Sequence, residues 1–243
     1  MVLNFDAHFL LKPTEVITKI IAKTKITPNQ ITLARFFFLT PPAVYLLSKD
    51  QYLTNVIAVL LLYLSAVLDQ VDGTLARNYN MKTEVGGWLD DFLNRVDQVV
   101  IAMGISWGVF THFNNDPRWL FMGLVFILSL NIQTYAGDAF KQNYNLYQDT
   151  LPKFWKLFEG KTISFWDIFL KDYLAPKSFF YTLISTLSYF IVIGSVLNIM
   201  HWMFVVMLLT ASLRAITMTY IYIRCILEKD KVSILVSNIK KLN

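Results

Sequence analysis

The chain has 243 residues, of which 55% are hydrophobic and 16% are charged, and its formal net charge is +5. A water-soluble domain of this length buries a sufficient core with far fewer apolar residues, so the excess indicates contact with lipid. The basic residues flank the apolar stretches instead of forming one patch, which excludes a nucleic-acid-binding surface and favours contacts with lipid headgroups. Cys225 is the only cysteine, which excludes an intrachain disulfide.

Residues 1–30 are predicted to form an amphipathic juxtamembrane segment ahead of the first span. Apolar side chains recur between residues 13 and 25 at a spacing that places them on one face of a helix. They are Val16, Ile17, Ile20 and Ile21. This pattern predicts a helix along the membrane surface, and a cap that packs on the bundle is the alternative. Pro28 suits the start of the next helix.

Residues 31–228 are predicted to form an all-α integral membrane domain with six transmembrane helices, because apolar stretches of around 20 residues recur along them. The predicted spans are residues 31–47, 53–68, 89–110, 119–135, 180–197 and 202–223. Between the fourth and fifth spans, residues 138–178 mix lysine with aromatic residues, which is typical of a cytosolic or interfacial insert. Residues 229–243 form a predicted cytosolic tail.

Lysine and arginine are divided unequally between the two sides of this predicted bundle. Seventeen lie in the segments on one side, whereas only Lys49 and Arg118 lie on the other. The bias places both termini in the cytosol. Within the spans, Arg35 lies near the cytosolic end and is expected to extend toward the interface. Arg214 lies in the last span, where it is interpreted either as a contact to a polar substrate group or as a structural partner of neighbouring helices.

Six acidic residues lie at the junction of the second and third predicted spans. If the second span continues as a helix, Asp69 and Asp72 are about 60° apart around it and one turn apart along it. Asp90, Asn94 and Asp97 have the spacing of one face of the third span. We therefore expect Asp69, Asp72 and Asp90 to converge at the cytosolic boundary.

Three converging carboxylates repel one another unless a cation lies between them, and oxygen donors without histidine or cysteine select Mg²⁺, Mn²⁺ or Ca²⁺ over zinc. Mg²⁺ shares its coordination shell with substrate phosphates, so the expected ligand is a diphosphate. Gly73, Ala76 and Gly86 leave room for a substrate, and Arg77 supplies a guanidinium for its phosphate. The alternative is a bundle in which ion pairs only neutralise charge. The histidines share no ligand spacing, and none is expected to bind metal: His8, His112 and His201.

The acidic and small residues form a recognisable pattern, Asp69-x2-Asp72-Gly73-x2-Ala76-Arg77-x8-Gly86-x3-Asp90. This pattern resembles the signature of the CDP-alcohol phosphotransferase (phosphatidyltransferase) family. The stretch TPNQIT at residues 27–32 is similar to the family's entry into its first span. The resemblance implies a phospholipid-synthesising enzyme in which an alcohol hydroxyl attacks the β-phosphorus of a CDP-linked donor, usually CDP-diacylglycerol, and CMP leaves.

The resemblance also implies roles for individual residues. Two Mg²⁺ or Mn²⁺ ions would be held by Asp69, Asp72 and Asp90. The CDP-linked donor would lie against Asp72, Gly73, Ala76, Arg77 and Gly86. The family further implies a homodimer, a lipid donor in the membrane and a small polar alcohol from the cytosol. Acceptors in the family include glycerol phosphate, inositol or its phosphate, and serine, and the sequence does not select one.

One position departs from the family pattern, which ends with a fourth aspartate that acts as the general base. Asn94 occupies that position, and its amide is no base near neutral pH, so about 10²–10⁴-fold in rate would be lost. Three interpretations remain: an engineered Asp-to-Asn change, a natural variant with slow or absent catalysis, or the use of Asp97 as the base. The alternative function is a non-catalytic membrane protein that retains metal and CDP binding. A transporter is disfavoured because its acidic residues should lie nearer mid-membrane.

Overall fold

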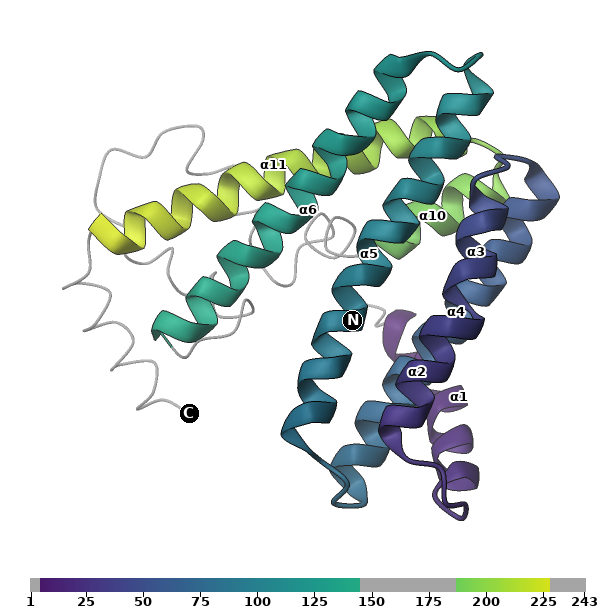
Figure 1. The fold of residues 1–243 in the computed structure, drawn as a ribbon, viewed down its shortest axis with the longest axis vertical. Helices are drawn as coiled ribbons and strands as arrows, with labels where there is room; N and C mark the ends of the chain where they lie inside the picture. The colour runs from purple at the N-terminus through teal and green to yellow at the C-terminus, as the bar shows by residue number, and fades with distance from the viewer. Residues whose placement is uncertain (1–4, 145–186, 228–243) are drawn as a thin grey trace. The chain divides into compact units, whose positions relative to one another are not determined.

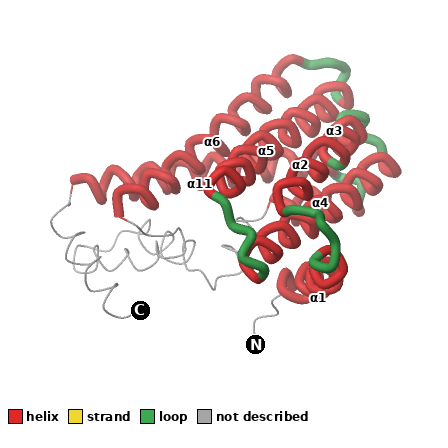
Figure 2. The backbone as a smooth tube through the Cα atoms, turned by 60° about the horizontal axis from the view of Figure 1, so that its bottom comes forward, coloured by secondary structure: helices red, strands yellow, loops and turns green. Residues whose placement is uncertain are grey.

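The computed structural model describes residues 5–144 and 187–227, and the regular secondary structure in these ranges is α-helical (Figures 1 and 2). The helices are α1 (Phe5–Ile21), α2 (Pro28–Phe38), α3 (Thr40–Leu47), α4 (Tyr52–Asn78), α5 (Glu84–His112), α6 (Pro117–Tyr144), α10 (Leu187–Val196) and α11 (Met200–Leu227). The described residues form two compact units. Residues 5–123 and 191–204 make up the first, and residues 124–144, 187–190 and 205–227 make up the second.

Helix α1 packs against α4 through one of its faces. Ile17 and Ile21 contact a core cluster of the first unit, formed by Ile31, Val67, Val71 and Leu75. Val16 and Ile20 are more than half exposed. The predicted apolar face is therefore divided, because part of it covers the bundle and part of it stays available to lipid. The amphipathic helix is present, and its position on a membrane surface remains a prediction.

The predicted first span consists of two helices, α2 and α3, separated at Leu39. Thr27 caps α2 in a reciprocal capping box with Gln30, and Pro28 is the first helical residue, as the sequence predicts. The helix is interrupted because Pro41 and Pro42 have no amide hydrogen to donate and their rings clash with the preceding turn. Together the two helices cover residues 28–47, a length that suffices to cross a bilayer.

Helices α2 and α3 pack against both α4 and α5 within the first unit (Figure 1). Glycines on α5 make the approach of α3 possible. A Cβ added at Gly104 would lie 3.0 Å from the carbonyl oxygen of Val44, and one added at Gly108 would lie 2.5 Å from that of Leu47. Residues on α2 can therefore reach side chains of α4 and of α5 at the same time.

The second unit contains most of α6 and α11. The hydroxyls of Ser129 and Ser212, one from each helix, are 3.1 Å apart and form a hydrogen bond. Phe126, Leu130, Met207 and Met218 are among its buried apolar residues. A hydrogen bond between side chains of neighbouring helices is a common way to fix helix pairs within lipid.

Four described helical segments are long and apolar enough to cross a membrane, namely Pro28–Leu47, Tyr52–Asn78, Pro117–Ala136 and Met200–Tyr220. They support the predicted first, second, fourth and sixth spans. Helix α5 covers the predicted third span but is not among these four segments, and its first half carries acidic residues. Helix α10 covers only part of the fifth, whose residues 180–186 lie outside the described ranges. The total of six spans remains a prediction.

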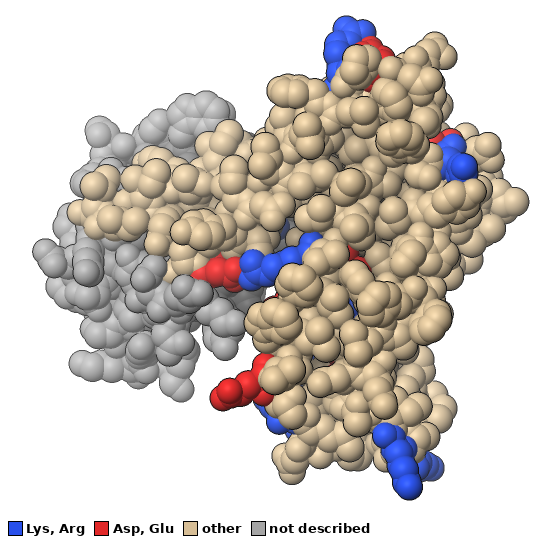
Figure 3. Space-filling view, viewed as in Figure 1, with Lys and Arg blue, Asp and Glu red and all other residues tan. Residues whose placement is uncertain are grey.

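The face drawn in Figure 3 is mostly uncharged over the described residues, as expected for helices that contact lipid. Helix α6 continues to Tyr144 and so includes the first residues of the predicted polar insert. The rest of that insert and the predicted tail, residues 145–178 and 229–243, lie outside the described ranges. The cytosolic placement of both termini remains a prediction.

Replacing Gly108 with alanine should lower the midpoint of thermal unfolding in detergent. The added methyl group would meet the Leu47 carbonyl at 2.5 Å, and forcing the helices apart should cost about 1–3 kcal/mol. Gly87→Ala on the same helix is the matched control, because an added Cβ there meets nothing within 4 Å. The control should be neutral or slightly stabilising. Equal stability of the two variants would contradict the close α3–α5 packing.

Candidate active site

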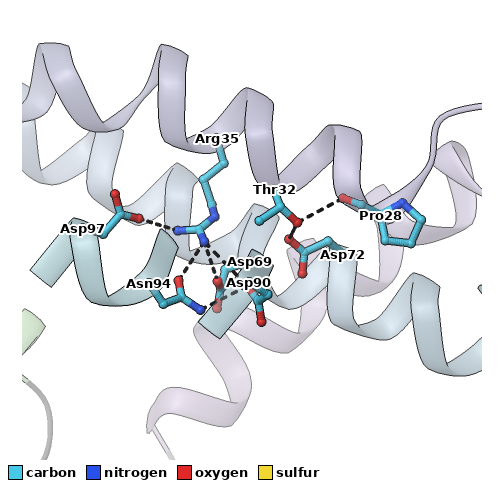
Figure 4. Close-up of polar contacts among 8 residues, drawn as sticks. All are labelled: Pro28, Thr32, Arg35, Asp69, Asp72, Asp90, Asn94 and Asp97. Atoms are coloured by element: carbon cyan, nitrogen blue, oxygen red, sulfur yellow. Dashed lines mark hydrogen bonds and ion pairs between the residues drawn. The ribbon is translucent and has the colours of Figure 1, made fainter. Parts of the chain in front are cut away.

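The side chain of Arg35 lies at the centre of a polar network inside the first unit (Figure 4). Arg35 is on α2 and is only 3% exposed. Its Nη1 donates a 2.7 Å hydrogen bond to Oδ2 of Asp97, and its Nη2 donates a 2.7 Å hydrogen bond to Oδ1 of Asn94. Both partners are on α5, one turn apart. The guanidinium is thereby fixed against one face of that helix.

The same guanidinium also attracts carboxylates from α4 and from the first turns of α5. Nη2 of Arg35 is 3.1 Å from Oδ1 of Asp69 and 3.8 Å from Oδ1 of Asp90. Asn94 connects the two sides, since its Nδ2 donates a 3.1 Å hydrogen bond to Oδ1 of Asp90. Acidic residues from two helices thus converge on one cation supplied by a third.

Asp72 is placed by the first turn of α2. The hydroxyl of Thr32 lies 2.7 Å from Oδ2 of Asp72 and 3.1 Å from the carbonyl oxygen of Pro28. Asp72 is 4% exposed and lies one turn after Asp69 on α4. Thr32 and Arg35 are themselves one turn apart on α2, so this single helix face positions both aspartates of α4.

The network has a buried side and an accessible side. Arg35 and Asp97 are buried, whereas the side chains of Asp69 and Asp90 are 30% and 38% exposed. Oδ1 of Asp69 is buried and accepts no hydrogen bond among the described residues, although Arg35 neutralises it as an ion pair. An all-oxygen donor set with such an atom, reachable from one side, fits hard divalent cations such as Mg²⁺ or Mn²⁺.

The small residues next to the acids lie at close approaches between side chains. A Cβ added at Gly73 would be 3.0 Å from Nη1 of Arg77, so the guanidinium of Arg77 lies over that glycine. A Cβ added at Gly86 would be 2.6 Å from Oδ1 of Asn29, at the start of α2. The absence of a side chain at Gly86 therefore lets polar groups of α2 and α5 lie next to each other.

The structure places Asp69 and Asp72 on α4 and Asp90 and Asn94 on α5, and it brings these predicted site residues to one region. Their roles as metal ligands and as the position of the general base remain predictions. The expectation that Arg35 extends toward the interface is wrong, because the acidic residues hold it inside the bundle. The sequence did contain a sign that Arg35 has buried partners, because a charged residue within an apolar stretch requires neighbouring groups that compensate its charge.

Two further features were missed or remain open. Thr32 and Asn29 lie in the TPNQIT stretch, but their contacts with α4 and α5 were not predicted, because these contacts depend on which helices are neighbours. Arg214 lies on α11 in the second unit, where it takes part in an interaction, and its role in acceptor binding remains a prediction. The homodimer also remains a prediction.

Comparison with known protein families gives a match over residues 25–150, to the model of CDP-alcohol phosphatidyltransferases. The archaetidylinositol phosphate synthase of Pyrococcus horikoshii is 37% identical over 98 residues, which cover 40% of this chain and 50% of that protein. The phosphatidylinositol phosphate synthase of Corynebacterium glutamicum is 27% identical over 135 residues, which cover 53% of this chain and 60% of that protein. The chain thus matches between half and three-fifths of the length of these two relatives.

A solved structure supports the same fold. The phosphatidylinositol phosphate synthase of Mycobacterium tuberculosis, with CDP-DAG bound, superposes with a TM-score of 0.50 at 16% sequence identity. The superposition covers 84% of this chain and 92% of that one. At this identity the likeness shows the fold alone. The fold and the four apolar helical segments together describe a multi-pass membrane protein.

Replacing Arg35 with methionine should strongly destabilise the first unit. Removing one partner of a buried ion-pair network leaves its carboxylates uncompensated and typically costs about 3–5 kcal/mol. Thermal unfolding in detergent with EDTA should show the loss, and Mn²⁺ should recover part of it, because a divalent cation can replace the missing charge.

Arg118→Met is the matched control for this experiment. Arg118 also pairs with an aspartate, Asp116, but its side chain is 86% exposed, so its removal should leave the unfolding midpoint unchanged. If Arg35→Met is as stable as Arg118→Met, Arg35 does not hold the acidic cluster together.

Proposed function

Because the chain belongs to the CDP-alcohol phosphatidyltransferase family, we propose that it transfers a phosphatidyl or related group from a CDP-linked lipid to a small polar alcohol, with release of CMP. The observation that carries the proposal is the convergence of Asp69, Asp90 and Asp72 at one end of α4 and α5, with an accessible side. The bound CDP-DAG of the solved mycobacterial synthase supports a CDP-linked lipid as the donor.

Inositol phosphate is the proposed acceptor. Relatives from Pyrococcus horikoshii and Corynebacterium glutamicum are both named as synthases of inositol phosphate lipids. A phosphorylated polyol is polar and would reach the site from the aqueous side, while the lipid donor keeps its chains in the bilayer. Glycerol phosphate and serine are the comparison acceptors in the test below.

Asp69, Asp72 and Asp90 are the proposed holders of two divalent cations, Mg²⁺ or Mn²⁺. When bound, such ions neutralise the diphosphate and the charge that develops on the attacking and leaving oxygens. The remaining roles belong to the side chains themselves. Thr32 orients the carboxylate of Asp72. The proposed contacts of the CDP group are Arg77, Gly73, Ala76 and Gly86.

Asn94 determines how well the site could perform the reaction. Its amide accepts a hydrogen bond from Arg35 and donates one to Asp90, so it positions neighbouring groups but cannot take a proton from an alcohol. Asp97 is a poor substitute for the base, because it is 7% exposed and is paired with Arg35 at 2.7 Å. Asn94 is therefore compatible with two functions, a slow enzyme and a non-catalytic CDP-binding protein.

Removing a proposed metal ligand should abolish divalent-dependent CMP release. The full chain in detergent would be given CDP-diacylglycerol, Mg²⁺ or Mn²⁺ and each acceptor, and CMP would be measured. Asp69→Asn and Asp90→Asn should each reduce the rate at least about 10²-fold, since the cations supply several kcal/mol of charge stabilisation. Asp91→Asn, an exposed neighbour on α5, is the matched control and should retain the rate. Equal losses in all three variants would refute the ligand assignment.

Restoring a carboxylate at position 94 should increase CMP release. Asn94→Asp would supply the missing general base, and the expected gain is about 10²–10⁴-fold. The same variant is the best background for the acceptor screen if the unchanged chain is slow. No gain, with a readily measurable rate in the unchanged chain, would contradict the missing-base explanation.

The non-catalytic alternative predicts a different pair of results. Calorimetry with CDP and Mg²⁺ should show binding to the unchanged chain, while CMP release stays at background with every acceptor. Binding should be lost in Asp69→Asn and retained in Asp91→Asn. Turnover by the unchanged chain would exclude this alternative.

A further inference from the structure

A second cluster of potential metal ligands lies in the first unit. It is separate from the group of carboxylates around Arg35, namely Asp69, Asp72, Asp90 and Asp97, which is called the acidic network below. Asp50 is in the turn between α3 and α4, His112 is the last residue of α5, and His201 is the second residue of α11. One ligand atom from each lies within 4.8 Å of the others. Their separation along the chain explains why spacing in the sequence gave no sign of a site, and the expectation of no histidine ligand has to be reconsidered.

The carboxylate of Asp50 is buried, and one of its oxygens lacks a hydrogen-bond donor among the described residues. Its side chain is only 6% exposed, and its Oδ1 accepts a 3.2 Å hydrogen bond from Nδ2 of Asn55. Its Oδ2 lies 3.0 Å from Nδ1 of His112, yet it accepts no hydrogen bond among the described residues. Leaving a buried carboxylate oxygen without a hydrogen bond is costly, and a bound cation would remove that cost.

The two imidazoles are held side by side by aromatic neighbours. The rings of His112 and His201 stack at 4.7 Å between centroids with an interplanar angle of 20°. Phe113 packs edge-on against both, and Trp119 stacks on Phe113 at 4.5 Å. The side chain of His112 is 41% exposed, so an ion can reach the cluster from solvent.

We propose that Asp50, His112 and His201 bind one Zn²⁺. Two imidazole nitrogens and one carboxylate oxygen are a donor set that zinc accepts in tetrahedral geometry, with a water molecule in the fourth position. Bonds of about 2.0–2.1 Å place tetrahedral ligands roughly 3.3 Å apart. The three ligand atoms now lie within 4.8 Å of one another, so ion binding requires the two imidazoles to turn out of their stack until both nitrogens face the ion. Asn55 orients the carboxylate from behind, as outer-shell partners of metal ligands do.

This site differs from the acidic network in position and in chemistry. Asp50 precedes the first residue of α4, whereas Asp69 lies far along the same helix, so the two are separated by roughly 25 Å. His112 and Asp90 likewise lie near opposite ends of α5. The acidic network offers oxygen alone, and such sets favour Mg²⁺ or Mn²⁺. Zinc at the histidine cluster would instead tie three chain segments together at the other end of the helices.

Gly108 is a second feature that allows the end of α5 to lie close to the turn between α3 and α4. It lies one turn before His112, and a Cβ added there would contact Cβ of Asp50 at 3.3 Å as well as the Leu47 carbonyl. The missing side chain thus lets α5 approach the turn that carries Asp50. Such proximity is a requirement for His112 and Asp50 to share an ion.

Zinc content tests the proposal directly. The full chain in detergent would be stripped with EDTA, loaded with Zn²⁺ in millimolar Mg²⁺ to occupy the oxygen-only site, freed of excess metal and analysed by mass spectrometry. About one zinc per chain is expected, as for a three-ligand protein site. His112→Asn and His201→Asn should each lose it. His8→Asn and Asp69→Asn are controls that should retain it.

Two further measurements keep the result decisive if a variant is unstable. Co²⁺ bound to the unchanged chain should give the intense visible absorption of a tetrahedral site, and the unfolding midpoint should rise with Zn²⁺ in the unchanged chain but not in the His112→Asn, His201→Asn double variant. A weak octahedral spectrum, no retained zinc, or equal zinc in the unchanged chain and the double variant overturns the proposal and leaves Asp50 and His112 as an ordinary ion pair.

Discussion

The buried guanidinium of Arg35 sets the arrangement of the first unit. A permanent positive charge that is 3% exposed within an apolar helix has to be compensated by neighbouring groups, and here α4 and α5 provide them. Because one end of the fork contacts Asp97 and the other contacts Asn94 and Asp69, the position of α2 along both neighbours is fixed. Sliding any of the three helices by one turn would leave a charge without a partner.

The N-terminal end of α2 completes the site through its own local chemistry. The capping box of Thr27 and Gln30 fixes where the helix begins, and this start places Thr32 on the face that reaches Asp72. It also places Asn29 beside Gly86, whose missing side chain leaves space for that contact. The capping box at the start of α2 thus helps to determine which side chains of α2 contact α4 and α5.

Local features of the site could be predicted from the sequence, whereas contacts between helices could not. The positions of Asp69 and Asp72 on one helix depend only on helix periodicity, and the pattern around them was sufficient to indicate the family. The role of Arg35 depends on α2 packing against both α4 and α5, and no periodicity specifies that neighbourhood. The contact between His112 and His201 could not be predicted for the same reason, because the two residues are far apart along the chain and meet only through helix packing. The number of spans depends partly on residues outside the described ranges.

An amide at position 94 adds no negative charge to the acidic network, whereas a carboxylate there would add one. Three carboxylates, those of Asp69, Asp90 and Asp97, pair with one guanidinium, and that of Asp72 lies in the same region on Thr32, so the region already has an excess of negative charge. Nδ2 of Asn94 donates to Asp90 at 3.1 Å, whereas an aspartate there would place two carboxylates at that distance, which is tolerable only with a cation between them. Asn94 therefore stabilises the cluster in the absence of metal, whereas the proposed reaction would require a carboxylate at this position to accept a proton. Stability without metal and catalytic competence are thus opposing demands on one side chain.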